Sequence, residues 1–256
     1  MAEISAKMVM ELRAKSGVSM MACKKALVEA GGDADAAMEI LRKKGAAKAA
    51  DKADRATAEG TVAVVGRAAA ALNCETDFVA KNADFVAFAR EIAKIADEQN
   101  PDAAKKYFDE KKTEMITKLG ENITLGGISK IEVGQIVGSY VHSNGKLAAL
   151  VAIDGGDETV ARDIAMHVAA SDPKVLSPDE VDDAIVAKER EIWTEQLKNS
   201  GKPENIIDKI LIGKEKKFRE ENALLKQNFV KNPEISVENF AKEKGATVVA
   251  FLRISV

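Results

Sequence analysis

Asp77 and Phe78 are the neighbouring residues whose types best suit contact with another molecule. A carboxylate can interact electrostatically with a bound metal cation, and a large aromatic ring can serve as an apolar anchor in the surface of a partner protein. The pair lies in a polar connection that follows an apolar run at 68–72, typical of a buried strand, and precedes a helical pattern that starts at Phe85. Aromatic residues make up only 4% of the chain, so a phenylalanine in this connection requires an explanation.

Two explanations fit this spacing. In the first, Asp77 caps the helix that follows, and Phe78 packs beneath that helix as an ordinary core residue. In the second, the connection carries a binding function and displays both side chains to a partner. The residue types alone leave both explanations open.

The cysteines and histidines give little support for catalysis or metal binding. Cys23 and Cys74 form no C-x-x-C pair, which suits free thiols in a reducing compartment, and Cys74 is expected to be a small buried residue. Neither His142 nor His167 has metal-ligand spacing, and the apolar helix around His167 favours a structural role. The phosphate-binding motif G-x-x-x-x-G-K-[ST] is missing. We expect no cofactor, no metal and no covalent catalysis, with a cysteine-dependent enzyme as the weakest hypothesis.

Composition argues against several other classes of protein. The 256-residue chain is 46% hydrophobic and has a formal net charge of −3, with both signs interspersed. It can bury a substantial core, and it lacks the broad basic face expected of a nucleic-acid-binding protein. No apolar run approaches the length that spans a membrane, and Glu3 interrupts any signal peptide. We expect a cytoplasmic protein with no direct contact to nucleic acid or membrane.

The first 45 residues predict three short helices, each preceded by a capping side chain and ended by glycine. Met20 and Met21 are paired on the second helix, and flexible methionines suit an adaptable docking surface. Residues 46–59 are rich in Ala, Lys and Asp without a sustained apolar stripe, which is typical of a linker. The predicted capping residues are Ser5, Ser19 and Asp33, and the predicted helix ends are Gly17, the pair Gly31 and Gly32, and Gly45.

A weak internal repeat predicts the architecture that follows. In each copy, a hairpin of two strands is followed by a helix and later by a closing strand. The hairpins begin at Gly60 and Gly138, the helices contain 89–93 and 161–165, and the closing strands are 130–133 and 253–256. The predicted fold class is therefore α+β, with a small helical bundle followed by a duplicated ββα…β core of antiparallel sheets.

The two copies differ in length between the hairpin and the helix. The first copy has seven more residues there than the second, and the segment 76–82 accounts for them. Because the second copy lacks this segment, the scaffold does not need it. Binding residues concentrate on loops that a rigid scaffold holds in place. We therefore interpret 76–82 as a functional protrusion.

The second copy has its own insertion at 177–229, which predicts two long helices joined at 200–203. Gly201 suits the C-terminal cap of the first helix, and Pro203 suits the first turn of the second. We expect these helices to form a projecting hairpin. The apolar residues of its two faces are Ile185, Ile192, Trp193 and Leu197 in the first helix and Leu211, Phe218 and Leu225 in the second.

Several short strings resemble the elongation factor Ts family, whose members exchange nucleotide on elongation factor Tu. Each string is weak alone, but together they are specific and cover nearly the whole chain. They are M-M-A-C-K-K-A-L at 20–27, T-D-F-V-A-K at 76–81, L-G-E-N-I at 119–123, S-Y-V-H at 139–142, A-M-H-V-A-A-S at 165–171 and S-G-K-P at 200–203. The chain is identified on this basis as a member of that family, and we expect the bacterial type because no transit peptide precedes the bundle.

This resemblance implies a function and a set of partner-binding residues. The protein would bind elongation factor Tu, both GDP-bound and nucleotide-free, and promote GDP release by disturbing the Mg²⁺ and phosphate site. The implied contact residues are Thr76, Asp77, Phe78, Val79, Ala80, Lys81 and Asn82 for displacement of Mg²⁺, and Leu12, Met20, Met21, Leu119, Gly120 and His142 elsewhere. The alternative from another class is an adaptor or scaffold whose bundle is the only active part.

The resemblance also implies a division into domains. The helical hairpin would mediate contact with a second subunit, as a homodimer, or with elongation factor Tu. The divisions are 1–45 as a ubiquitin-associated-like three-helix domain, 46–59 as a linker, 60–137 as the first core module, 138–176 with 230–256 as the second, and 177–229 as the hairpin.

Overall fold

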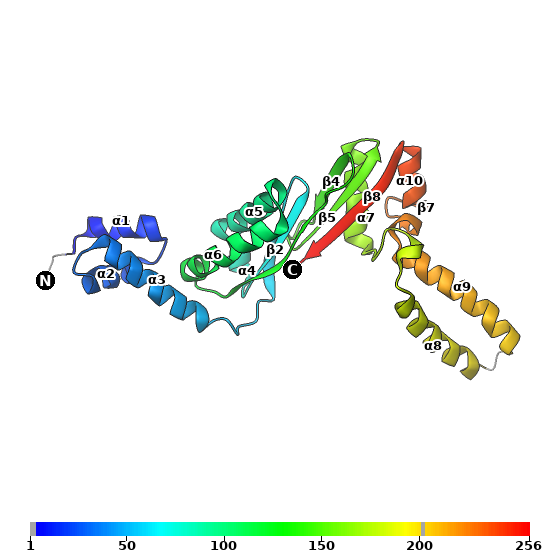
Figure 1. Ribbon diagram of the computed structural model, residues 1–256, viewed down its shortest axis with the longest axis horizontal. Coiled ribbons are helices and arrows are strands. Elements are labelled where there is room, and N and C mark those ends of the chain that lie inside the picture. Colours follow the sequence, from blue (N-terminus) through cyan, green and yellow to red (C-terminus); the bar gives the residue numbers. More distant parts are fainter. Residues whose placement is uncertain (1–3, 201–202) are drawn as a thin grey trace. The chain divides into compact units, whose positions relative to one another are not determined.

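The computed structural model describes residues 4–200 and 203–256, and its fold is α+β, as predicted (Figure 1). It divides into two compact units. The first contains the chain up to Lys130 together with Asn144–Lys146 and Ile254–Val256, and the second contains Ile131–Ser143 and Leu147–Arg253.

Three helices form the N-terminal bundle of the first unit: α1 (Ala6–Ser16), α2 (Met20–Glu29) and α3 (Ala34–Ala50). All three predicted caps are present, because the side chains of Ser5, Ser19 and Asp33 accept hydrogen bonds from backbone amides in the first turn of their helices. The bundle core consists of Val9, Leu12, Cys23, Ala26, Leu27, Ala37 and Leu41.

The prediction that the third helix ends at Gly45 is wrong, because α3 continues through Gly45 to Ala50. The glycine has a packing role instead. A Cβ atom on Gly45 would lie 2.4 Å from the hydroxyl oxygen of Thr117, so only glycine permits this close approach to the neighbouring helix. The connecting segment is correspondingly shorter than the predicted 46–59.

The rest of the first unit is a three-stranded antiparallel sheet covered by helices. Its strands are β1 (Glu59–Val65), β2 (Ala68–Cys74) and β3 (Ile123–Lys130), in the order β1-β2-β3. The helix α5 (Ala83–Glu98) packs on this sheet, and α6 (Pro101–Leu119) packs on α5. The predicted apolar stripe of α5 is confirmed, since Phe85, Phe88 and Ile92 are buried in the shared core.

The closing strand predicted at 130–133 lies earlier in the chain, at β3. The register explains the difference. Lys130 pairs with Ala68, the first residue of β2, so the ladder between β2 and β3 ends at this pair. Gly134 follows with a positive φ of 84°, in a segment without regular structure.

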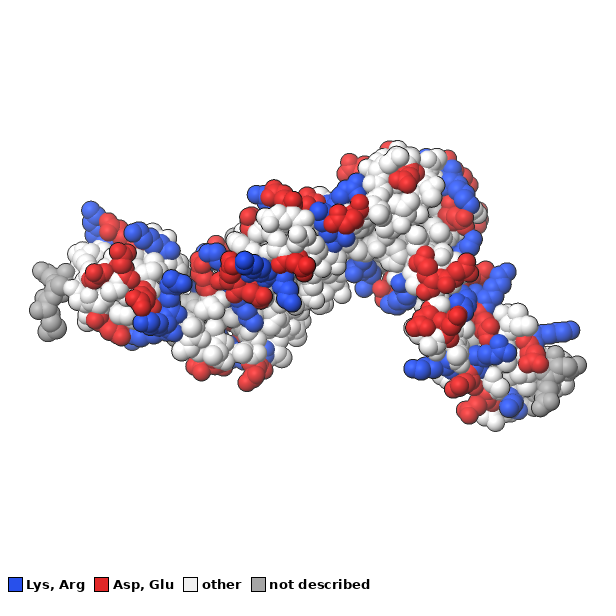
Figure 2. Space-filling model, in the orientation of Figure 1, with Lys and Arg blue, Asp and Glu red and all other residues white. Residues whose placement is uncertain are grey.

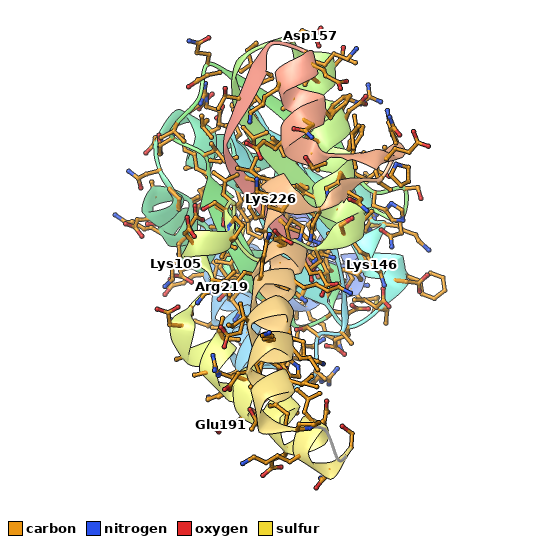
Figure 3. The ribbon with its side chains drawn as sticks, turned by 90° about the vertical axis from the view of Figure 1, so that its right-hand side faces the viewer. Lys105, Lys146, Asp157, Glu191, Arg219 and Lys226 are labelled. Atoms are coloured by element: carbon orange, nitrogen blue, oxygen red, sulfur yellow. The ribbon has the colours of Figure 1, made fainter. Side chains whose placement is uncertain are left out.

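The second unit repeats the plan of a sheet and a covering helix. The sheet contains β4 (Ile136–Val141), β5 (Leu147–Gly155) and β8 (Ala246–Ser255) in the order β4-β5-β8, and α7 (Glu158–Ser171) packs on β4 and β5. Asp157, labelled in Figure 3, caps α7 by accepting a hydrogen bond from the amide of Val160 (3.0 Å). The remaining short elements are β6 (Asn228–Phe229), β7 (Asn232–Ser236) and α10 (Val237–Glu243).

The predicted helical hairpin is present in the second unit as α8 (Asp183–Asn199) and α9 (Glu204–Asn222), flanked by the short 3₁₀ segments Pro178–Glu180 and Leu224–Lys226. Arg219, labelled in Figure 3, ties the base of the hairpin by donating to the carbonyl of Val181 (2.9 Å) and pairing with Asp183. The predicted cap Gly201 lies outside the described residues. Pro203 precedes α9 instead of occupying its first turn.

The predicted apolar face of α8 is confirmed at Trp193 and Leu197, but its heptad pair, Ile185 and Ile192, is wrong by one position. Ile185 and Ile192 are 52% and 49% exposed, whereas Val186 and Leu197 are buried. Neighbouring helix positions point about 100° apart, so an offset of one residue moves a side chain off the seam. Leu225 falls outside α9, and Leu197, Ile207 and Leu211 form the seam with Trp193 and Ile210.

Candidate partner-binding site

The segment 76–82 folds as one short helix, α4 (Asp77–Ala80), between β2 and α5. The hydroxyl of Thr76 accepts a hydrogen bond from the amide of Val79 (3.4 Å) and caps α4. The side chain of Asn82 accepts one from the amide of Asp84 (2.9 Å) and caps α5. Asp77 caps neither helix, so the first explanation for its presence is wrong.

The ring of Phe78 points into solvent and is 82% exposed. It therefore does not pack beneath α5, as the first explanation required. The next two residues do the opposite, since Val79 and Ala80 are only 9% and 7% exposed and join the core of the sheet and α5. The short helix is thus attached through Val79 and Ala80 and displays Phe78.

Asp77 forms an ion pair with Lys81, one helical turn away, with 2.8 Å between the carboxylate and ammonium groups. The hydrogen bond and positive charge of Lys81 lower the pKa of Asp77, and Asp77 in turn raises the pKa of Lys81. Both side chains are largely exposed, so water screens the pair and it adds little to stability. The carboxylate is consequently ionised and accessible beside Phe78.

A second segment supports the start of the protruding helix. The carboxylate of Glu121 accepts hydrogen bonds from the amides of Glu75 (3.1 Å) and Thr76 (3.0 Å) and from the hydroxyl of Thr76 (2.6 Å). The carboxylate of Glu75 accepts one from the amide of Asn122 (2.7 Å). Neither glutamate stands out in the sequence as a support of this helix, because Glu121 and Glu75 are far apart in the chain.

These bonds bring the predicted contact residues Leu119 and Gly120 into the same neighbourhood as α4. Gly120 is exposed and ends α6 with a positive φ of 81°. Leu119 is half-buried and packs against the core of the sheet and α5. The structure therefore joins two of the predicted contact segments, 76–82 and 119–120, into one surface region.

The other predicted contact residues differ in exposure. Met20 and Met21 are 44% and 64% exposed on α2, as a docking surface requires. Leu12 is 2% exposed in the bundle core, so its position does not support contact with a partner. His142 belongs to the second unit, where it is exposed one residue beyond β4 and its ring contacts the hydroxyl of Tyr140 (3.1 Å).

Cys74 and His167 occupy buried positions and fulfil structural roles. Burial raises the pKa of the Cys74 thiol to about 11, with the Glu121 carboxylate adding to the shift, so this thiol is protonated at neutral pH and is a poor nucleophile. The ring of His167 accepts from the amide of Val230 at Nδ1 (3.2 Å), so Nε2 carries the proton and donates to the side chain of Gln227 (2.9 Å).

On the face shown in Figure 2, Lys and Arg side chains are interspersed with Asp and Glu in both units. None of the helices in the described part of the chain is long and apolar enough to cross a membrane.

Comparisons with known proteins agree on one family. The family model described as "Elongation factor TS" matches residues 75–256. A protein named Elongation factor Ts from Francisella tularensis subsp. novicida is 45% identical over 270 residues, covering 100% of this chain and 93% of that protein. A protein of the same name from Hahella chejuensis is 45% identical over 266 residues, again covering 100% of this chain and 93% of that protein.

Proposed function

This chain belongs to the elongation factor Ts family, and we propose that it binds elongation factor Tu and accelerates the release of GDP during translation elongation. It would bind both the GDP-bound and the nucleotide-free partner, in the cytoplasm. The observation that carries the proposal for this chain is the display of Phe78, 82% exposed on a helix whose neighbouring residues are anchored in the core.

Exchange of this kind needs no covalent step. A translational GTPase holds GDP through backbone donors of its phosphate loop and through Mg²⁺. A factor that binds best when that loop and ion site are distorted must weaken nucleotide binding, and the nucleotide must weaken the factor by the same ratio. In this proposal Phe78 enters between elements of the GTPase, and the Asp77 carboxylate disturbs the arrangement of the Mg²⁺ ligands.

The other proposed contact residues are those of the predicted set that lie exposed on the surface. Met20 and Met21 on the bundle, Gly120 beside α4 and, separately, His142 in the second unit would be further contact residues for elongation factor Tu. Deleting residues 1–50, up to the observed end of α3, should then leave a folded core with weakened affinity for elongation factor Tu. Unchanged affinity would show that the bundle serves another partner.

We further propose that the helical hairpin can mediate a homodimer. Ile185 and Ile192 on α8 and Ile206 and Ile212 on α9 are between 44% and 64% exposed, although the same helices carry a closed seam of their own. Exposed apolar side chains at this density mark surfaces that a partner can cover.

Release of labelled GDP from elongation factor Tu, with and without this protein, tests the proposed function. Faster release that rises with the concentration of the protein is the expected result. Binding to elongation factor Tu without faster release would instead favour the adaptor. Failure to bind elongation factor Tu would overturn the proposal.

A further inference from the structure

We propose that Glu121 is a positioning residue for nucleotide exchange, because it fixes the start of α4 and thereby the direction in which Phe78 is presented. The inference rests on the proposed function, since it assigns a role at the same site. Glu121 itself would touch neither elongation factor Tu nor the nucleotide.

The contacts of Glu121 concentrate on the residues just before Phe78. Its Oε2 atom accepts from the amides of Glu75 (3.1 Å) and Thr76 (3.0 Å), and its Oε1 atom accepts from the hydroxyl of Thr76 (2.6 Å). The same hydroxyl accepts from the amide of Val79 (3.4 Å). One carboxylate is therefore connected, through Thr76, to the first turn of α4.

Two additional hydrogen bonds hold the residues just before α4. The first joins the same two segments in the opposite direction, because the carboxylate of Glu75 accepts a hydrogen bond from the amide of Asn122 (2.7 Å). The buried thiol of Cys74 donates to the carbonyl of Thr76 (3.2 Å). Thr76 is thus held through its amide, its hydroxyl and its carbonyl.

A helix as short as α4 requires support of this kind. Four residues, Asp77 to Ala80, are far too few to form a stable helix alone, because the first turn carries an unfavourable nucleation step. Val79 and Ala80 hold the far end of α4 in the core, and Glu121 holds the near end. With both ends fixed, the exposed ring lies between two anchors and loses less freedom when it binds.

The chemistry of the site favours a carboxylate. All three groups that face Glu121 are donors to it, and an ionised carboxylate offers only acceptors. A glutamine keeps one acceptor oxygen but turns an amino group toward Thr76. The Thr76 hydroxyl would then have to accept from both Val79 and the glutamine, so Glu121→Gln should retain only part of the support.

Asp97, near the end of α5, offers a matched control in the same module. Its carboxylate accepts a hydrogen bond from the amide of Arg67 (2.8 Å), in the turn that precedes β2. Glu75 and Thr76 follow the other end of that strand. Asp97→Ala therefore removes a carboxylate bond to the backbone of the same module without touching the support of α4.

The experiment uses full-length chains carrying Glu121→Ala, Glu121→Gln or Asp97→Ala. GDP release from elongation factor Tu and amide hydrogen exchange in the free protein are measured below the melting temperature of every variant. We expect Glu121→Ala to slow GDP release by about tenfold or more, because small displacements of an acting group have large kinetic effects. Amides of 76–80 should lose protection, those of β2 should keep it, and Glu121→Gln should be intermediate.

Two outcomes would overturn the inference. One is normal GDP release by Glu121→Ala despite lost protection at 76–80. The other is an equal loss of activity in Asp97→Ala, which would indicate a general effect on the module. If the unmodified protein does not accelerate GDP release, the proposed function fails instead, and the protection at 76–80 still reports whether Glu121 orders α4.

Discussion

Phe78 and Val79 are consecutive in the chain, yet one is 82% exposed and the other only 9%. The two neighbouring residues therefore have different roles in α4, one in attaching the helix to the core and the other in displaying a side chain to a partner. Val79 attaches the helix to the core formed by the sheet and α5, and Phe78 is left with almost no contact to its own chain. Substitutions at these neighbouring positions should therefore affect different properties.

Phe78→Ala should leave the melting temperature nearly unchanged, because the ring buries little surface within the protein. It should slow GDP release substantially, since an aromatic anchor at a partner typically contributes on the order of 2 kcal/mol or more. Thermal melting and stopped-flow GDP release on one preparation measure both effects. Phe85→Ala is the matched control: Phe85 is 0% exposed, so its truncation should cost roughly 3–5 kcal/mol of stability. A large fall in melting temperature for Phe78→Ala would contradict the proposed role.

Asp77→Ala should slow GDP release less than Phe78→Ala does, with the greatest effect at saturating Mg²⁺. The carboxylate is proposed to disturb the Mg²⁺ site, so depletion of Mg²⁺, which already weakens GDP binding, should mask its loss. An effect of Asp77→Ala that is independent of Mg²⁺ would argue against that role.

Lys81→Ala should raise the pKa of Asp77 towards its ordinary value, because Lys81 is the main cause of the lowered pKa. An NMR titration of the free protein measures this pKa.

Phe218→Ala should destabilise the helical hairpin by about 2 kcal/mol. This is less than the same substitution would cost at a fully buried site, because the ring of Phe218 is only half-buried beside Trp193.

The substitution Ile192→Ser should have little effect on stability, since the side chain of Ile192 is 49% exposed. If the hairpin mediates a homodimer, Ile192→Ser should weaken it while GDP release continues. Sedimentation and the GDP-release assay check both, and an unchanged dimer would exclude this face of α8.

His167 should make stability depend on pH. Burial lowers the pKa of this histidine in the folded protein, so the unfolded chain takes up a proton first as the pH falls. Stability should therefore decrease as the pH drops through about 6.5, the ordinary value for histidine, towards the lower folded value. Melting temperatures of the protein and of His167→Gln, measured between these limits, should show that the variant lacks this dependence. An identical dependence in both proteins would assign it to other groups.

The sequence predicted the elements that depend on local patterns. The spacing of Phe85, Phe88 and Ile92 predicted α5, and the caps Ser5, Ser19 and Asp33 predicted the bundle helices, because these signals involve residues within a few positions of each other. The resemblance and the excess length at 76–82 favoured exposure of Phe78. The residue pattern alone left its burial open.

Predictions failed where a distant partner decides the outcome. Gly45 resembles a helix end, but its role depends on Thr117, in a different helix. Ile185 and Ile192 fit a heptad, yet the seam with α9 runs one position further along α8. The structural role of Glu121 could not be predicted from its own position in the sequence. That role depends on hydrogen-bond donors at Glu75 and Thr76, which only the folded chain brings close to it.

Within the described residues, the hydrogen bonds and apolar contacts that hold α4 come from the module that carries it. Its anchors lie at Cys74–Thr76, Val79–Ala80 and Glu121, and the equivalent connection in the second copy is only 156–157. The two copies of a duplicated fold can therefore carry different functional elements. The first copy carries a protruding helix, which a local insertion provides and the Glu121 carboxylate supports. The second copy keeps the short connection and carries a different insertion, the hairpin of α8 and α9.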